Sequence, residues 1–442
     1  MKILLLTNLF PPHAAGTQDL RCQSMRDALR LRGHELLVLT SNHGLTGEQV
    51  DTEVRRQLWL NAVYEHPPVT AFRELQELER HNHAALRAAI AEFQPDILFV
   101  WSLHGLSKSL LVTLDRSGIP CAFDVADHWL SRGLRTDPWL RWWNTTTVPF
   151  QQKLMRGGME LSNQRDRLDE EAPTRFAPGV DRLPALFDTD GAPGTVEANS
   201  IRDLPMRRLY FCSLALQQLT EQYGFHVSHG AVIYPGIPTH LYSGEVKLAS
   251  TKAMKFLVSA PLVKESGIMT ALEALRIARE RGAKCSLNIY GRGDSDHVAQ
   301  LRSHVIRFQL PVEFHALNNP QREMPGVYGQ YDAFLHTSQW DEPYLIAPFK
   351  AMACGLPLIA STAGGAAEVL RHGENALTYS MGDAMELAGC MERLLAEPEL
   401  RMQLAHIGQN EVLTSHNEAN AASEVENYLT ETVLIWHGGN DE

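Results

Sequence analysis

The stretch WDEPYLIAPFKAMACGLPLIASTAGGAAEVLRHGENAL, residues Trp340–Leu377, decides the fold. It begins with a helical pattern that runs to Cys354, and the apolar run Leu358–Ser361 that follows has the length of a buried strand. The next three residues, Ala363–Gly365, are small and predict a tight turn into another helix. Helix, strand and helix in this order predict one repeat of an α/β domain with a parallel sheet.

The two turns beside this strand are predicted to meet a ligand through their backbone. Glu342 and Pro343 lie between a strand expected to end near Ser338 and the helix, and proline suits the first turn of a helix. Free N–H groups and the positive end of the helix dipole attract a phosphate or a sugar hydroxyl. Gly364 and Gly365 repeat this arrangement after the next strand, and the alternative is that they only permit a tight turn.

The same alternation of short apolar runs and longer helical patterns fills both halves of the chain. It predicts strands over residues 3–7, 36–40, 96–101, 121–125 and 208–213, and then over 255–259, 285–290, 332–336 and 358–361. The predicted fold class is therefore α/β, with two Rossmann-like domains at 1–240 and 241–415, and with a C-terminal helix within 416–442 that crosses back. Residues 161–205, rich in Pro, Gly and Asp, are expected to form an irregular surface excursion of the first domain.

Composition excludes several classes of protein. A chain of 442 residues is too long for one ordinary core, and its net charge of −12 argues against binding nucleic acid. Its six cysteines are scattered singly, which favours reduced thiols over disulfides or a zinc site, and no metal site is expected. No apolar run reaches the length of a membrane span, and the N-terminus has no pattern of a signal peptide, so a cytoplasmic location is expected.

The quoted stretch resembles the core of the retaining GT-B glycosyltransferases of family 4. Further matches are RLRGHELLVLTS at 30–41, YPGIPTHLYSG at 234–244 and YGRGD at 290–294. The resemblance implies two Rossmann-like domains that face a cleft. It also implies a nucleotide-diphosphate sugar as donor, an acceptor that the sequence does not name, and neither metal nor cofactor.

The resemblance also implies roles for individual residues. Glu342 would contact the donor sugar, and Asp127 or His128 would approach from the acceptor side. The remaining donor-side candidates are mainly backbone positions and basic side chains: Gly16, Lys264, Gly291, Arg292, Pro343, Tyr344, Leu345, Ile346, Lys350, Gly364 and Gly365. For Gly16 and the Gly291 turn, an ordinary tight turn is the alternative.

Three positions depart from the family's donor site. Pro261 and Ser266 stand where relatives carry the arginine and lysine that clamp the diphosphate, and Lys350 replaces a glutamate that holds the ribose. Each charge-assisted hydrogen bond to phosphate contributes roughly 1.5–3 kcal/mol, so losing two weakens binding on the order of a hundredfold to several-thousand-fold. Lys264, Arg292 or Lys350 itself is expected to compensate. The alternatives are a catalytically silent homologue that serves as a partner or regulatory subunit and, less favoured, a nucleotide-sugar epimerase.

The segment Trp139–Gly158 combines three tryptophans with several basic residues and little acid. Such a composition is typical of an acceptor-binding face or of a peripheral membrane or protein contact. The alternative is that the tryptophans pack in the core while the basic side chains are solvated.

Overall fold

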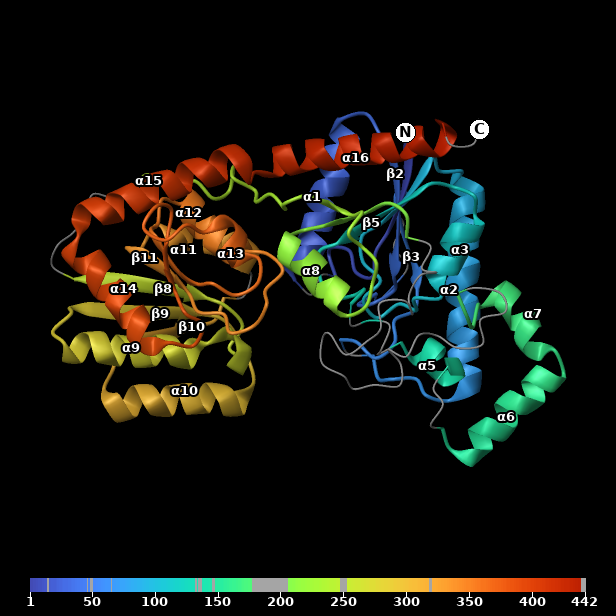
Figure 1. Cartoon of the computed structure of the whole chain (residues 1–442), viewed down its shortest axis with the longest axis horizontal. Helices are drawn as coiled ribbons and strands as arrows, with labels where there is room; N and C mark the ends of the chain where they lie inside the picture. The colour runs from blue at the N-terminus through green and yellow to red at the C-terminus, as the bar shows by residue number, and fades with distance from the viewer. Residues whose placement is uncertain are drawn as a thin grey trace. The chain divides into compact units, whose positions relative to one another are not determined.

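The computed structural model describes the whole chain except residues 14–15, 46, 48–50, 65, 132, 134–136, 145–147, 177–205, 247–252, 318–319 and 439–442. The chain forms two compact units, Met1–Ile233 with Ala422–Glu442, and Tyr234–Ala421 (Figure 1). The boundaries of these units differ by a few residues from the domains 1–240 and 241–415 expected from the sequence.

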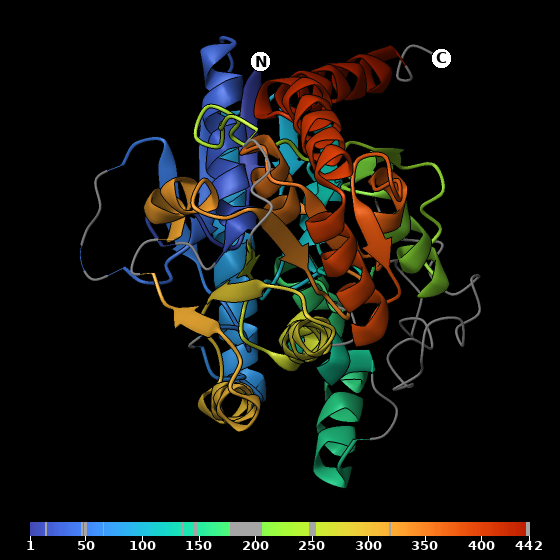
Figure 2. The ribbon, with the colours of Figure 1, turned by 90° about the vertical axis from the view of Figure 1, so that its left-hand side faces the viewer.

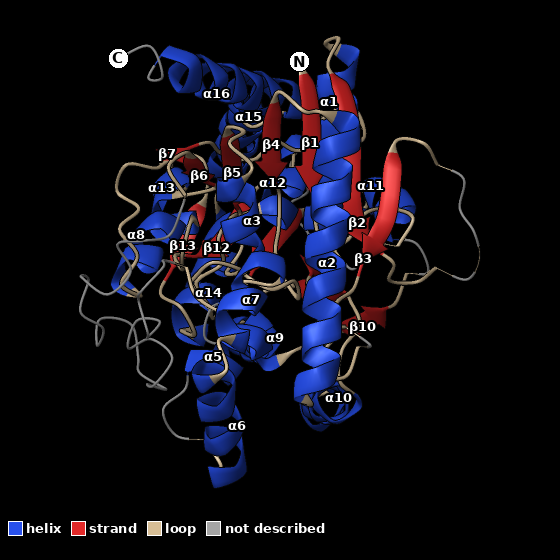
Figure 3. Cartoon of the chain, turned by 90° about the vertical axis from the view of Figure 1, so that its right-hand side faces the viewer, coloured by secondary structure: helices blue, strands red, loops and turns tan. Residues whose placement is uncertain are grey.

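The first unit is built on a parallel sheet in the order β3-β2-β1-β4-β5-β6-β7 (Figure 3). Its strands are β1 (Lys2–Leu6), β2 (Glu35–Ser41), β3 (Val54–Leu58), β4 (Ile97–Val100), β5 (Cys121–Val125), β6 (Leu209–Phe211) and β7 (Ala231–Val232). Its helices are α1 (Thr17–Leu31), α2 (Phe72–Phe93), α3 (Leu110–Arg116), α5 (Pro138–Asn144), α6 (Phe150–Leu161), α7 (Gln164–Glu171) and α8 (Leu214–Gln222). Apart from Lys2 at the start of β1, the central strands β1 and β4 are apolar, as expected for a parallel sheet covered on both faces.

The second unit has a parallel sheet in the order β10-β9-β8-β11-β12-β13. Figure 2 shows its strands and helices, coloured from yellow to red, from another side. Its strands are β8 (Met254–Ser259), β9 (Cys285–Tyr290), β10 (Val312–His315), β11 (Ala333–His336), β12 (Leu358–Ser361) and β13 (Leu377–Tyr379). Its helices are η3 (Lys264–Ser266), α9 (Ile268–Glu280), α10 (Ser295–Phe308), α11 (Pro320–Tyr328), α12 (Ile346–Ala353), α13 (Ala366–Val369), α14 (Ala384–Ala396) and α15 (Pro398–Ser415).

The last helix, α16 (Glu418–Gly438), belongs to both units. Its buried side chains Val425 and Leu429 lie in the same apolar cluster as Ile3 and Phe99 of the first sheet. Two further hydrogen bonds hold it there: the Tyr428 hydroxyl donates to the Leu209 carbonyl at 2.8 Å, and His34 bonds Glu426 at 2.8 Å. The segment from Ala422 onward is therefore part of the first core.

Around residue 160 the structure differs from the sequence expectation. Residues 164–171 form helix α7, and its Arg165 and Leu168 are buried, although this segment was expected to be irregular and on the surface. Packing explains the difference, because Arg165 lies over the Trp143 ring at 5.5 Å and thereby fixes the helix. The part of the excursion at 177–205 lies outside the described residues. The three tryptophans Trp139, Trp142 and Trp143 are buried, as the core alternative expected.

Candidate functional site

The strand orders place a candidate site at the same point in each sheet. In both sheets the strand order reverses after the first strand, between β1 and β4 and between β8 and β11. Because parallel crossovers are right-handed, helices on the two sides of this point cover opposite faces and leave a crevice at the carboxyl ends of the strands. Ligands of doubly wound domains bind in that crevice. The loops after β8 and β11 are therefore the candidate ligand-binding loops of the second unit.

Glu342 follows β11 and is tied to the glycine turn after β12. Its carboxylate lies 3.2 Å from the His336 Nε2 atom and is partly exposed. The Gly365 N–H donates to the Glu342 carbonyl at 3.0 Å. Gly364 has φ +58°, and a Cβ there would lie 2.4 Å from the same carbonyl oxygen. The structure thus brings Glu342, Gly364 and Gly365 together.

Two sequence expectations about these turns are wrong. Helix α12 begins at Ile346, so Glu342 and Pro343 precede the helix instead of opening it. The Gly365 N–H is bonded within the protein and is not free for a ligand. The extended loop makes this possible, because it carries the Glu342 carbonyl back onto the turn.

The donor-side residues next to Glu342 are mostly turned into the protein. The Tyr344 hydroxyl bonds the His416 Nδ1 atom at 2.9 Å in a buried position, and Leu345 is completely buried. Ile346 is half-buried at the first position of α12. The side chains of Tyr344 and Leu345 are therefore directed into the protein, so the ligand contacts expected for 344–346 are backbone contacts.

The loop after β8 packs directly under the β11 loop. The Thr337 hydroxyl donates to the Ser266 carbonyl at 2.7 Å, and the Gln339 N–H donates to the Glu265 carbonyl at 2.7 Å. Gly267 has φ +65°, and a Cβ there would lie 1.8 Å from the Thr337 carbonyl oxygen. Position 267 therefore needs glycine, and Ser266 is held beneath the site loop.

The glycines after β9 are explained by close packing of backbones. A Cβ on Gly291 would lie 2.0 Å from the Ala260 carbonyl oxygen, and Gly293 is equally close to Leu262. Arg292, between them, is exposed and donates to the Leu317 carbonyl at 2.9 Å. The tight-turn alternative therefore accounts for Gly291, while Arg292 stays at the carboxyl edge of the sheet.

The two candidate lysines differ in their surroundings. The Lys350 ammonium lies 4.8 Å from the centre of the Tyr242 ring. Burial lowers its pKa, and the nearby Glu418 carboxylate raises it. Lys264 is exposed on η3 and forms no ion pair with any residue that the structure describes. Of the two, Lys264 is the cation free to meet an anionic ligand.

Polar side chains also gather at the carboxyl edge of the first sheet. Asp127 follows β5 and accepts the Trp129 N–H at 2.6 Å, and the adjacent His128 bonds the Ser131 hydroxyl at 3.4 Å. Burial raises the pKa of Asp127 and lowers that of His104, and each of the two charged forms favours the other. Both shifts favour the neutral forms.

Two further residues of this edge were missed by the sequence analysis. Asn8, after β1, donates to the Tyr64 hydroxyl at 3.1 Å, and the Tyr64 ring lies 5.9 Å from that of His104. Tyr64 has φ +54°, a conformation that tyrosine rarely adopts and that no sequence signal announced. Gly16 opens α1, is exposed, and donates its N–H to Asp19 at 3.0 Å.

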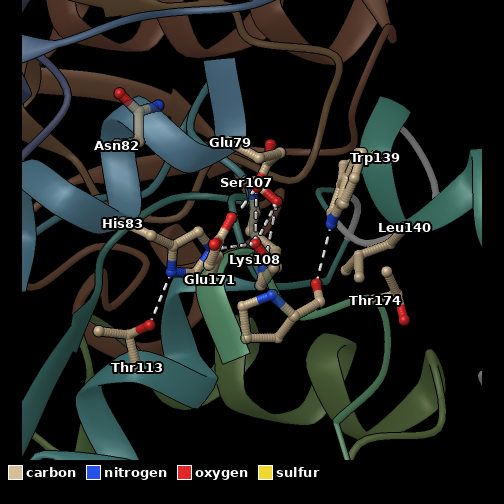
Figure 4. Close-up of polar contacts among 12 residues, drawn as sticks. Glu79, Asn82, His83, Ser107, Lys108, Thr113, Trp139, Leu140, Glu171 and Thr174 are labelled. Carbon is tan, nitrogen blue, oxygen red and sulfur yellow. Dashed lines mark hydrogen bonds and ion pairs between the residues drawn. The ribbon is translucent and has the colours of Figure 1, made fainter. Parts of the chain in front are cut away.

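A buried polar network in the first unit is a separate feature (Figure 4). Between α2 and the start of α3, His83 bonds the hydroxyls of Thr113 at 2.6 Å and Ser109 at 2.9 Å. Ser109 in turn donates to Glu79 at 2.8 Å. The Lys108 ammonium is capped by the carbonyls of Leu103 and Leu106. These groups are buried and bonded to one another, so we assign the network to stability.

The network predicts a pH effect. Burial raises the pKa of Glu79 to about 7, against the lowering effect of its serine hydrogen bonds, whereas an unfolded glutamate titrates near 4.5. The stability that this group contributes is therefore complete below pH 4.5 and is lost as the pH rises through 7. Glu79→Gln keeps the size and the acceptor but cannot ionise. Relative to wild type, its free energy of unfolding should rise by about 3 kcal/mol between pH 4.5 and 8.

Urea unfolding at several pH values measures this difference. Glu77→Gln, an exposed change on the same helix, is the matched control and should show no such pH dependence. A difference between Glu79→Gln and wild type that stays constant with pH would contradict the assignment.

Two family models match the chain in separate regions. "Glycosyl transferase 4-like domain" matches residues 16–150, and "Glycosyl transferases group 1" matches residues 245–411. The crystal structure of HepE from Anabaena in complex with UDP-glucose superposes with a TM-score of 0.63, 17% identity, and coverage of 98% of this chain and 100% of that one. Sucrose-phosphate synthase from Thermosynechococcus elongatus gives 0.63 and 16%, with 97% and 98% covered. The chain has the GT-B fold.

Curated relatives of this GT-B chain match over shorter stretches. The amylovoran biosynthesis glycosyltransferase AmsK of Erwinia amylovora is 28% identical over 165 residues, which are 36% of this chain and 40% of that protein. Spore coat protein SA of Bacillus subtilis is 33% identical over 91 residues, 20% of this chain and 24% of that protein. The chain thus spans less than half the length of these two relatives.

The described residues hold neither a cluster suited to a metal ion nor a helix suited to span a membrane. Within them, no three His, Cys, Asp or Glu side chains come together in a geometry that would hold a metal ion. Among the helices described, none combines the length and the apolar character that a membrane span requires.

Proposed function

We propose that this GT-B chain is a glycosyltransferase that moves a sugar from a nucleotide-diphosphate sugar to an acceptor hydroxyl with retention at the anomeric carbon. The observation that carries the proposal is the junction of Glu342, the Gly364–Gly365 turn and the Ser266–Gly267 loop at the crevice of the second sheet. The UDP-glucose complex of HepE supports a nucleotide sugar as the donor class. The expected cytoplasmic location stays a prediction.

Glu342 is the residue that we assign to the donor sugar. It is a carboxylate beside a histidine at a partly exposed edge, so it accepts hydrogen bonds from sugar hydroxyls and stabilises positive charge that develops at the anomeric carbon. The backbone of Tyr344–Ile346 and the 363–365 turn border the sugar or phosphate. On the first unit, Asp127 or His128 is assigned to the acceptor side, with His104 and Tyr64 as neighbours of Asp127, and Gly16 stays a candidate for the donor side.

The diphosphate needs a cation, and we assign Lys264. Pro261 has no N–H to donate, Ser266 is neutral and buried, and Lys350 already lies against Tyr242 near Glu418. Lys264→Ala should therefore weaken nucleotide-sugar binding about ten- to a hundredfold, by roughly 1.5–3 kcal/mol. Isothermal titration measures it, and Lys284→Ala, an exposed lysine at the other end of the sheet, is the control.

Lys350 is the alternative candidate for the cation that holds the diphosphate. If Lys350→Ala loses the affinity while Lys264→Ala keeps it, the diphosphate is held from α12 and the assignment to Lys264 is wrong. If both variants bind the nucleotide sugar as tightly as wild type, neither lysine replaces the cations that are missing at positions 261 and 266.

The second candidate function is a catalytically silent homologue that acts as a partner or regulatory subunit. The replacements at Pro261, Ser266 and Lys350 favour it. A thermal-shift panel of nucleotide sugars separates the two, since a ligand at a hundred times its Kd stabilises by about 2.7 kcal/mol. A transferase gives a shift with at least one donor, and a silent homologue gives none. Turnover of the donor that binds, with the anomeric configuration of the product read by NMR, tests retention.

A further inference from the structure

A cavity at the amino ends of the second sheet is not used by the proposed function. Its volume is about 450 Å³, and it lies between the starts of β8 and β9, the last turn of α9 and the residues just before β10 and β11. A cavity of this size holds a small organic molecule. The six residues of β8 put its two ends roughly 17–20 Å apart, so the cavity is separate from the donor crevice at the carboxyl ends.

Three cationic side chains line this cavity, and they come from three different elements. Lys255 belongs to β8, Lys284 precedes β9, and Arg279 lies in the last turn of α9. All three are exposed, and none forms an ion pair with a residue that the structure describes. Asp332 is the one carboxylate among the described residues of the lining, and it accepts the Lys255 N–H at 2.8 Å. The lining therefore carries three positive charges and one negative charge.

The surroundings of the cavity do not neutralise these cations. The carboxylates nearest to the end of α9 along the chain and on α14 are paired with other arginines: Glu280 with Arg276, and Glu392 with Arg281. The negative end of the α9 dipole accounts for Arg279, but Lys255 and Lys284 lie outside the helix. In a chain of net charge −12, this is a local positive field, and a bound anion would relieve the repulsion among the three cations.

The floor of the cavity is apolar. Met254 and Cys285 are buried, and Pro311 beside them is half-buried. Burial raises the pKa of the Cys285 thiol to about 11, so this side chain stays neutral. The floor is also tied to the cationic rim, because the Met254 N–H donates to the Lys284 carbonyl at 3.0 Å and the Arg279 guanidinium donates to the Cys285 carbonyl at 3.0 Å.

We propose that this cavity binds a phosphorylated small molecule, with its phosphate held by Lys255, Lys284 and Arg279 and its organic body on the apolar floor. A phosphate dianion accepts several charge-assisted hydrogen bonds at once, which suits three cations without carboxylate partners. Lys264 and Glu342, which we assign to the donor, lie at the opposite ends of the strands. The ligand of this cavity therefore binds without displacing the nucleotide sugar.

Isothermal titration of the full chain tests this proposal with ribose 5-phosphate, inorganic phosphate and ribose. Ribose 5-phosphate should bind severalfold more tightly than inorganic phosphate, because only the ester has an organic body for the floor, and ribose should not bind. Lys255→Ala and Lys284→Ala should each weaken the binding of ribose 5-phosphate about tenfold. The affinity should also fall as the salt concentration rises from about 0.1 to about 1 M, where the screening length shrinks from about 10 to about 3 Å.

Arg307→Ala is the matched control, because Arg307 is an exposed arginine on α10 of the same unit and lies outside the lining. Its affinity for ribose 5-phosphate should equal that of wild type. Thermal unfolding without ligand shows that each variant is folded.

Several results would overturn the proposal. They are a wild type that does not bind ribose 5-phosphate, variants at Lys255 and Lys284 that bind it as wild type does, and equal affinity for the ester and for inorganic phosphate. Displacement of ribose 5-phosphate by the nucleotide sugar, or its loss in Lys264→Ala alone, would place the phosphate in the donor crevice instead. The titration needs neither donor nor turnover, so this test can fail independently of the proposed function.

Discussion

Replacing Glu342 with glutamine is expected to lower the rate of nucleoside diphosphate release from the donor sugar by about a hundred- to a thousandfold. The change removes the negative charge but keeps the size of the side chain beside His336. Loss of one preorganised electrostatic contact in an active site raises the barrier by about 2.7–4 kcal/mol, which is this range of rate. The loss should appear mainly in kcat, because the interaction strengthens as charge develops at the anomeric carbon.

Glu374→Gln is the control for this result. That carboxylate is exposed in the same unit and pairs with Arg371 at 2.9 Å, so its removal should change the rate less than twofold. Activity of Glu342→Gln within threefold of wild type would show that this carboxylate has no part in the reaction.

Gly267→Ala is expected to destabilise the second unit by about 2–5 kcal/mol. A residue with a Cβ at φ +65° is strained by roughly 1–2 kcal/mol, and overpacking adds roughly 1–3 kcal/mol. The methyl group would meet the Thr337 backbone carbonyl, which cannot rotate away as a side chain could. Because Thr337 also holds the Ser266 carbonyl, the loop after β11 should shift and donor binding should weaken with it.

Gly389→Ala is the control, because this substitution is expected to raise the free energy of unfolding instead of lowering it. Gly389 lies within α14 and has no atom within 4 Å of an added Cβ, so alanine should stabilise by roughly 0.5–1 kcal/mol through its helix propensity. Urea unfolding of both variants measures the pair. A Gly267→Ala protein as stable as wild type would mean that the loop after β8 does not pack as described.

The architecture could be predicted because it rests on patterns that the sequence carries directly. The runs at 121–125, 285–290 and 358–361 became strands with the predicted bounds, since short and mainly apolar runs have few alternatives in an α/β domain. The strands β3, β7, β10 and β13 were not predicted. β3 is VRRQL, with only two buried residues, and β7 is two residues long, so neither carries an apolar pattern.

The candidate site was only partly predictable, because its geometry depends on contacts between distant loops. That Glu342 and the Gly364–Gly365 turn meet follows from neighbouring parallel strands, whose carboxyl ends share an edge. That the Gly365 N–H bonds the Glu342 carbonyl, or that Tyr64 takes a positive φ beside Asn8, has no local signal in the sequence. Gly267 was not singled out from the sequence, because its need for glycine comes from the distant Thr337 carbonyl.

Hydrogen–deuterium exchange with the donor sugar found by the thermal-shift panel tests the central claim most directly. At saturating donor, protection in the second unit should be confined to the loops at 260–267, 337–346 and 362–366, because these lie at the carboxyl edge where we place the donor. The amino-terminal ends of the same strands, at Lys255 and Cys285, should exchange as they do without donor. Protection at those ends with none at the three loops, or no protection anywhere at saturation, would contradict the account.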